Sequence, residues 1–179
     1  MADDKKERWF TYMAITTILI AVTATLSTFK GGGYSTRSLL NQTKASDQWA
    51  FFQSKSIKGY IYDMRSENLQ LQVEQLEKQK GNEEVVKKYK EKIEAYNKYV
   101  KNHEEEKTEI SKAAAGFEAQ RDDCKLHSDK FGMAVIFLQI SILLSSIATL
   151  SKKKFVWIIS LVLGAIGIFY FLDGFFLLM

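Results

Sequence analysis

This chain of 179 residues is long enough for one ordinary domain, but it joins apolar runs to a long polar stretch. Its 25 Lys and Arg residues face 21 Asp and Glu residues, and between residues 30 and 130 the count is 19 against 17. A nucleic-acid-binding protein needs a concentrated basic face, which such interspersed charges do not form. The single cysteine, Cys124, excludes an intramolecular disulfide, and the absence of proline favours long uninterrupted helices.

The first apolar run predicts a transmembrane helix at residues 9–29. It holds 21 uncharged residues, which is enough to cross a hydrocarbon core of about 30 Å. The run is longer than the apolar core of a secretory signal peptide, so we interpret it as an uncleaved anchor. Residues 1–8, which include Lys5, Lys6 and Arg8, are then a short cytoplasmic N-terminus.

A Gly-rich linker is predicted at residues 30–35, followed by a helical hairpin at residues 36–130. Lys80-Gly81-Asn82 marks a turn near residues 80–83, because Gly and Asn tolerate left-handed backbone geometry. Two helical arms joined by so short a turn must run antiparallel. Whether the second arm continues into the next membrane span stays open at this stage.

The second arm of this hairpin carries a heptad seam, in which residues follow one another in steps of three and four. The seam comprises Tyr89, Ile93, Tyr96, Val100, His103, Lys107, Ile110, Ala114, Phe117, Arg121 and Cys124. The first arm offers Ile57, Tyr60, Ile61, Met64, Leu69, Val73 and Leu76. Folding at the turn places Leu69 near Ile93 and Trp49 near Ala114, so the expected structure is an antiparallel coiled coil.

Four consecutive apolar residues, Trp49 to Phe52, interrupt this pattern on the first arm. They cannot all face one partner helix, so some of them must meet another surface. One interpretation is an interaction site for lipid, a second subunit or a ligand. The other is a widened internal core near the base of the hairpin.

The C-terminal part predicts two further transmembrane helices, at residues 131–150 and 155–179, joined by a basic link at residues 151–154. Lys152, Lys153 and Lys154 lie on the same side of the membrane as the N-terminal basic residues in a three-span topology. Because basic flanks stay cytoplasmic, the hairpin and the C-terminus are expected on the periplasmic or extracellular side.

Small residues line one side of the last span: Ser160, Gly164, Gly167 and Gly174. They allow close helix approach, either within one chain or between subunits. The same span holds one acidic residue, Asp173, near its far end. An intramembrane carboxylate is a candidate for proton or ion chemistry, although snorkelling to the headgroups explains this position more simply.

A resemblance to a known family rests on two segments. The first runs from Asn41 through Asp47-Gln48-Trp49-Ala50-Phe51-Phe52-Gln53 to Lys58, and the second from Lys153 to Gly167. Both resemble a bacterial membrane-protein family catalogued as domain of unknown function 4337. The resemblance implies a bacterial inner-membrane protein, and the family supplies no assigned activity, substrate or cofactor to carry over, so no cofactor is expected. It directs attention to Asp47, Gln48, Trp49 and Gln53. With Phe51 and Phe52 of the apolar run, these residues make up the predicted interaction site.

No constellation of residues specifies a reaction. Asp122, Asp123, Cys124 and His127 lie within two helical turns, but the first arm supplies no further His or Cys ligand nearby. The two histidines have no nucleophile and orienting group of the triad kind. We therefore expect no enzyme, no metal and no nucleic-acid partner. The expected partners are the lipid bilayer, further copies of the chain and a possible protein partner for the hairpin.

The fold class expected from the sequence is an all-α membrane protein with three transmembrane helices and a coiled-coil hairpin between the first two. Its expected function is that of a homo-oligomeric structural or scaffolding protein. The alternative is an oligomeric pore, channel or transporter subunit lined by the hydroxyl-rich first span, because one chain has too few spans for a transport path.

Overall fold

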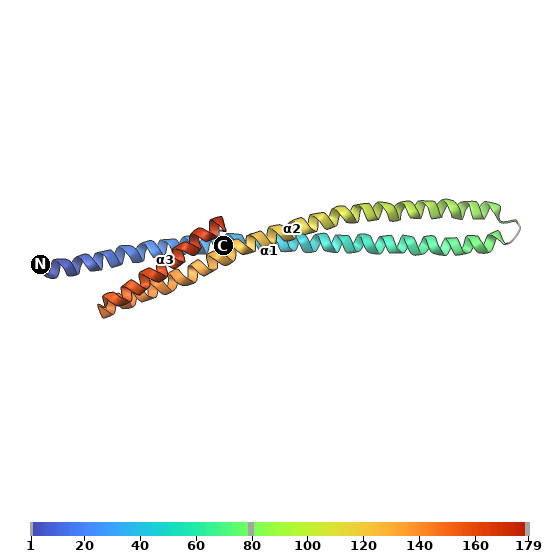
Figure 1. The fold of residues 1–179 in the computed structure, drawn as a ribbon. Coiled ribbons are helices and arrows are strands. Elements are labelled where there is room, and N and C mark those ends of the chain that lie inside the picture. The colour runs from blue at the N-terminus through green and yellow to red at the C-terminus, as the bar shows by residue number, and fades with distance from the viewer. Residues whose placement is uncertain (1, 79–80, 178–179) are drawn as a thin grey trace. The chain divides into compact units, whose positions relative to one another are not determined.

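The computed structural model describes residues 2–78 and 81–177, with side chains from residue 9 onward. Three helices account for nearly all of these residues, namely α1 (Ala2–Glu77), α2 (Glu83–Ser151) and α3 (Lys154–Phe176), which can be followed by colour in Figure 1. The described residues contain no β-strand. The chain divides into an anchor unit, formed by Met1–Leu40 and Gln120–Met179, and a polar unit, Asn41–Ala119.

All three helices contain a segment long and apolar enough to cross a membrane. The predicted spans at residues 9–29 and 131–150 lie within α1 and α2, and the predicted span at residues 155–179 begins within α3, which ends at Phe176. Residues 178 and 179 lie outside the described part of the chain. The predicted turn at 80–83 is described only from Gly81 onward, and Gly81 has a positive φ of 99°. That backbone conformation suits glycine because it has no Cβ.

The anchor unit is held together by two small apolar clusters. Ile20 and Ala24 of α1 pack against Ala134 and Leu138 of α2, with Tyr170 and Phe171 of α3 beside them. A second cluster contains Trp9, Met13, Ala148 and Trp157. Small side chains at these contacts let the helices approach closely, which is the usual basis of packing between membrane helices.

The predicted link between the last two spans is shorter than residues 151–154. Helix α2 ends at Ser151 and α3 begins at Lys154, so Lys152 and Lys153 alone lie between them. Lys152 has a φ of 55° and Lys153 is extended, which reverses the chain within two residues.

The predicted flexible linker at residues 30–35 is wrong, because α1 is helical throughout this segment. Gly31 faces Phe131 of α2, and a Cβ on this glycine would lie 2.9 Å from the Phe131 Cβ. Close packing of two helices therefore explains this glycine, and Ser128 Oγ donates a hydrogen bond to the Gly31 carbonyl at 3.2 Å. The segment is a helix contact, and helix packing offsets the low helix propensity of glycine. Likewise, α2 continues without a break from the second arm into the second span.

In the polar unit, contacts between α1 and α2 follow the register that the turn predicts. Ser66 Oγ donates to Asn97 Oδ1 at 2.8 Å, and Tyr62 stacks on Tyr99 with ring centroids 5.1 Å apart. Every residue of the seam predicted on the second arm, Tyr89 through Cys124, is buried or half-buried. The periodicity of that helix therefore identified the face that α2 turns toward α1.

The seam predicted on the first arm is wrong between residues 57 and 64. Ile57, Tyr60, Ile61 and Met64 are exposed, whereas Leu69, Val73 and Leu76 are buried or half-buried as expected. The heptad pattern that contains Leu69 explains why. Continued toward the N-terminus, it passes through small and polar residues such as Ser66 and Gly59 and not through the apolar residues at 57–64. The face of α1 that is covered by α2 comprises Ala45, Gln48, Phe52, Lys55, Gly59, Tyr62, Ser66, Leu69, Val73 and Leu76.

Candidate interaction surface

The structure separates the interaction residues predicted near the start of the polar unit into two groups. Trp49 and Phe52 turn toward α2, with their rings 5.5 Å apart, and Trp49 Nε1 donates a hydrogen bond to Glu118 Oε1 at 2.9 Å. The Lys107 ammonium lies 5.3 Å from the Phe52 ring centroid. Gln48 is half-buried on the same face. These three residues take part in the contact between the two helices of the polar unit, although Trp49 keeps 36% of its surface exposed.

The remaining predicted residues, Asp47, Phe51 and Gln53, are exposed. Phe51 keeps 49% of its surface accessible, and the Lys55 ammonium lies 5.4 Å from its ring. Each interpretation drawn from the sequence thus fits part of the four-residue apolar run. Some of its residues pack against α2, and others remain on the surface.

A larger apolar surface lies further along α1. Four residues on its outer face form what we call the outer stripe: Ile57, Ile61, Met64 and Leu71. Their exposed fractions are 58%, 43%, 68% and 61%, and Tyr60 at the edge of the stripe is 68% exposed. The spacing of four, three and seven residues keeps all four on one side of the helix. Ile57, Met64 and Leu71 thus each leave more than half of their surface exposed to solvent.

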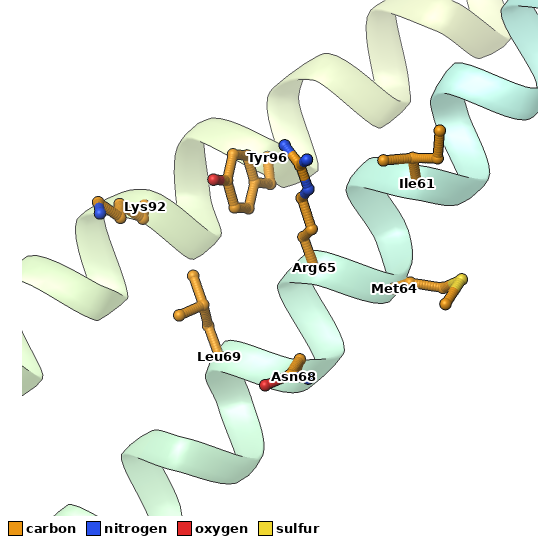
Figure 2. Close-up of a pocket in the computed structure, with 7 residues that line it drawn as sticks. All are labelled: Ile61, Met64, Arg65, Asn68, Leu69, Lys92 and Tyr96. Atoms are coloured by element: carbon orange, nitrogen blue, oxygen red, sulfur yellow. The ribbon is translucent and has the colours of Figure 1, made fainter.

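A groove between α1 and α2 borders the outer stripe, with a cavity of about 400 Å³. Figure 2 shows Leu69 pointing toward α2, whereas Met64 points away from it, and Arg65 extends toward Tyr96. Neighbouring residues of α1 therefore lie on two different faces of the helix. One face is covered by α2 and the other is open to solvent.

Helix α2 exposes fewer large hydrophobic residues than α1 does. Within the polar unit, the described large hydrophobic residues exposed on α2 are Val85 and Tyr99 alone, whereas α1 exposes seven. On α1 they are Trp49, Phe51, Ile57, Tyr60, Ile61, Met64 and Leu71. A charged helix surface needs no partner, but a row of large apolar side chains on one face is typical of an interaction site.

Polar residues beside the contact between the two helices form ion pairs. Lys55 Nζ pairs with Glu106 Oε2, and His103 Nδ1 lies 3.3 Å from the same oxygen. The hydrogen bond from Lys55, assisted by His103, lowers the pKa of Glu106. His103 also stacks on Tyr62 with ring centroids 6.0 Å apart, so it acts as a polar position of the seam.

The structure corrects the snorkelling interpretation of Asp173 in the anchor unit. The Asp173 side chain is fully buried, and Lys130 Nζ lies 2.9 Å from its Oδ2. Lys130 keeps 22% of its side chain exposed. The carboxylate is therefore neutralised inside the protein by a lysine of α2, which is how buried charges in membrane segments are usually accommodated.

One turn before Lys130, His127 completes this polar cluster. Its Nδ1 lies 2.8 Å from the Gly174 carbonyl oxygen, which can only accept, so Nδ1 carries the proton and donates. Its ring stacks on Tyr34 of α1, and Nε2 lies 4.0 Å from Asp123 Oδ2. Neighbouring Asp122 instead pairs with Arg121, whose hydrogen bond lowers the pKa of that carboxyl group.

Of the residues Asp122, Asp123, Cys124 and His127, His127 thus joins helices, whereas the two aspartates pair with residues of α2 itself. No group of three metal-ligating side chains occurs among the residues that the structure describes. His127 of α2 connects all three helices of the anchor unit, because its ring stacks on Tyr34 of α1 and its Nδ1 donates to the Gly174 carbonyl of α3. The role of this polar group is therefore to hold the helices together.

The small residues predicted to pack the last span are all buried inside the anchor unit. A Cβ on Gly164 would lie 2.9 Å from Ile20 Cδ1, and one on Gly167 would lie 2.7 Å from Leu138 Cγ. Gly174 faces the Phe131 ring in the same way, and the Ser160 carbonyl accepts a hydrogen bond from Ser141 Oγ at 2.6 Å. These positions pack within one chain, which is the first of the two interpretations drawn from the sequence.

The outer stripe is the set of candidate residues that sequence reasoning misassigned. A signal for it exists in the spacing, because Met64 and Leu69 are five residues apart and no heptad seam contains both. The apolar residues before and after this gap therefore belong to two different faces of α1. Reading both groups as one seam concealed the second face.

The fold and these surfaces define an all-helical protein with three helices capable of crossing a membrane. A family model described as "Domain of unknown function (DUF4337)" matches residues 9–177, and the chain belongs to this family. No curated protein matches the chain. No solved structure matches it either.

Proposed function

We propose that this chain is a structural protein of a membrane, anchored by three spans and assembled into a homo-oligomer. In this proposal the polar unit is an antiparallel coiled-coil hairpin that holds further copies of the chain, or a protein partner, at the membrane surface. The buried seam of α2 and the matching register of the Ser66 and Tyr62 contacts support the coiled coil.

The observation that carries this proposal is the outer stripe. This row of large apolar side chains is exposed to water on an otherwise charged helix. Burying it against a partner is favourable by about 25 cal/mol for each Å² of apolar surface removed from water. The inner face of α1 is already covered by α2, so the stripe requires a partner from outside the chain. A scaffolding protein uses such a surface for assembly.

We also propose that the protein is not an enzyme. Its histidines are engaged in contacts between helices or along one helix, His103 with Glu106 and His127 with Gly174. A general acid or base needs a position from which it can reach a substrate, and these side chains are held by structural partners.

The hydroxyl groups of the first span argue against a pore. Each of six side chains of α1 donates a hydrogen bond to a carbonyl of its own helix: Thr16, Thr17, Thr23, Thr25, Ser27 and Thr28. This pattern satisfies a hydroxyl group in lipid without any aqueous path. We expect no ion flux from liposomes that contain the protein, whereas flux that a Thr23→Leu change abolishes would support a pore instead.

For the location we propose a bacterial inner membrane, with the N-terminus in the cytoplasm and the polar unit on the periplasmic side. The basic residues before α1 and between α2 and α3 support this orientation. Single cysteines at Lys153 and Tyr99, in a Cys124→Ser background, test it in intact cells. A membrane-impermeant thiol reagent is expected to label the Tyr99 position and to leave the Lys153 position unlabelled; the reverse pattern inverts the topology.

The mass of the full-length protein in nanodiscs, measured by native mass spectrometry, tests the central proposal. A homo-oligomer is expected at membrane concentrations of the protein. A monomer under conditions that preserve the helices would overturn the homo-oligomer.

A further inference from the structure

The outer stripe has the spacing of a heptad seam of its own. Ile57, Ile61, Met64, Asn68 and Leu71 follow in steps of four, three, four and three. This seam lies on the face of α1 opposite to Tyr62, Ser66 and Leu69, because residues advance about 100° each around the helix. Helix α1 therefore carries two coiled-coil faces, of which α2 covers one.

The charges beside the outer stripe differ on its two edges. Lys58 and Arg65 follow Ile57 and Met64 and make one edge basic, whereas Glu67 and Glu74 make the other edge acidic. When two copies of such a helix pack in parallel, the basic edge of one meets the acidic edge of the other. When they pack antiparallel, like edges meet and repel.

Anchoring in a membrane favours the same geometry. Copies inserted in the same direction into one bilayer are related by an axis normal to the membrane, so equivalent helices run parallel. Both the edge charges and the anchoring thus select a parallel pair of α1 helices.

Asn68 supplies an independent indication of the partner. It is exposed in the middle of the stripe, and its Oδ1 accepts a hydrogen bond from Gln72 Nε2 at 2.8 Å. A single asparagine within an otherwise apolar seam fixes the register of parallel homodimers, because it is best satisfied by the asparagine of the partner. A lipid surface would offer no such matching amide.

We propose that the outer stripe binds the outer stripe of a second copy, with the two α1 helices parallel and in register at Asn68. This inference rests on the proposed homo-oligomer and names its interface. The assembled core would then contain four helices, with α1 of each copy between its own α2 and the partner's α1.

Disulfide cross-linking of the full-length protein in nanodiscs tests this interface. Three variants are made in a Cys124→Ser background, namely Ile57→Cys, Leu71→Cys and, as the exposed control on α2, Val85→Cys. Two cysteines form a disulfide when their Cα atoms lie within about 7 Å, which an in-register parallel pair achieves at each stripe position. The two stripe variants are expected to form dimers several-fold faster than the Val85 variant under mild oxidation.

The possible outcomes separate this inference from the proposed function. Equal cross-linking at all three positions, while native mass spectrometry still finds an oligomer, would overturn the interface and leave the homo-oligomer standing. Dimers that form only when the Ile57→Cys and Leu71→Cys proteins are mixed would indicate an antiparallel pair and would also overturn it. A monomeric mass in every sample would remove the proposed homo-oligomer as well.

Discussion

In the anchor unit, small and polar side chains are used inside the chain, whereas in the polar unit one helix leaves a row of large apolar side chains in solvent. Gly164, Gly167 and Asp173 are all buried between helices of a single copy. Ile57, Met64 and Leu71 of the polar unit each expose more than half of their surface. The small residues of α3 and its carboxylate are thus already packed within one copy, whereas the outer stripe of the polar unit is exposed.

Because of this difference, substitutions in the two units should affect different properties of the protein. Changes in the anchor unit should lower the stability of each copy, because its contacts close within the chain. Changes on the outer stripe should leave each copy intact and act on assembly. The following predictions test that separation, ordered by their expected effect on the free energy of unfolding.

The largest loss of stability is expected for Asp173→Asn. This change leaves the Lys130 ammonium without its 2.9 Å carboxylate partner in a buried site, which costs about 3 kcal/mol. Thermal unfolding of the full-length protein in detergent, followed by circular dichroism, measures the effect. The double variant with Lys130→Met serves as the control and should recover most of the loss; a single variant as stable as the parent would contradict the buried ion pair.

A loss of about 2 kcal/mol is expected for Gly167→Ala, because the new methyl group would meet both the side chain and the backbone nitrogen of Leu138. Gly132→Ala is the matched control, since no atom lies within 4 Å of a Cβ at that position. The control should be neutral or slightly stabilising, as alanine is the better helix former. Similar melting temperatures for the two variants would argue against close packing at Gly167.

A loss of about 1–2 kcal/mol is expected for Trp49→Ala, which removes the hydrogen bond to Glu118 and the contact with Phe52. We also predict that Trp49→Ala weakens assembly more than Tyr96→Ala does, as measured by native mass spectrometry. Equal effects that follow only the loss of helicity would assign Trp49 to the internal core alone.

Met64→Glu should change the stability of each copy by less than about 0.5 kcal/mol, because the side chain is 68% exposed. Its effect is expected on assembly, where a charge in the seam should shift the mass in nanodiscs toward the monomer. Val85→Glu on α2 is the control and should leave the mass unchanged, because Val85 is 40% exposed. An oligomer that survives Met64→Glu would place the interface elsewhere.

The smallest expected effect is a loss of stability at acidic pH. Because Lys55 and His103 lower the pKa of Glu106 in the folded protein, the stabilising contribution of this group is present at neutral pH. It is lost as the pH falls below the ordinary glutamate range and through the lowered pKa. Melting temperatures of the parent and Glu106→Gln should therefore differ slightly at neutral pH and converge in acid, whereas Glu105→Gln, its exposed neighbour, should follow the parent throughout.

Much of the fold follows from the sequence, because its strongest signals are periodic. The seam from Tyr89 to Cys124 predicted the covered face of α2, and the uncharged runs predicted the three segments that can cross a membrane. The two lysines between α2 and α3 marked the chain reversal. In each case one physical pattern, apolar spacing or apolar length, dominates its segment.

The parts that sequence reasoning missed are those where two requirements overlap in one segment. On α1, an inner seam with Gly59 and Ser66 runs beside an outer stripe with Ile61 and Met64, so the more apolar row was taken for the seam. Gly31 was taken for a linker residue because its partner, Phe131, is distant in sequence. The burial of Asp173 likewise depends on Lys130, which no local pattern connects to it.

The two-residue connection between α2 and α3 has a consequence for the order in which the anchor unit forms. The Ser141 hydrogen bond to Ser160 joins residues 19 positions apart, whereas the Thr17 contact with Ser145 joins residues 128 positions apart. Contacts between nearby residues form early because little chain entropy is lost in closing them. We therefore expect α2 and α3 to pair first, so that the first span, although synthesised earliest, docks last against a surface that the other two helices have already completed.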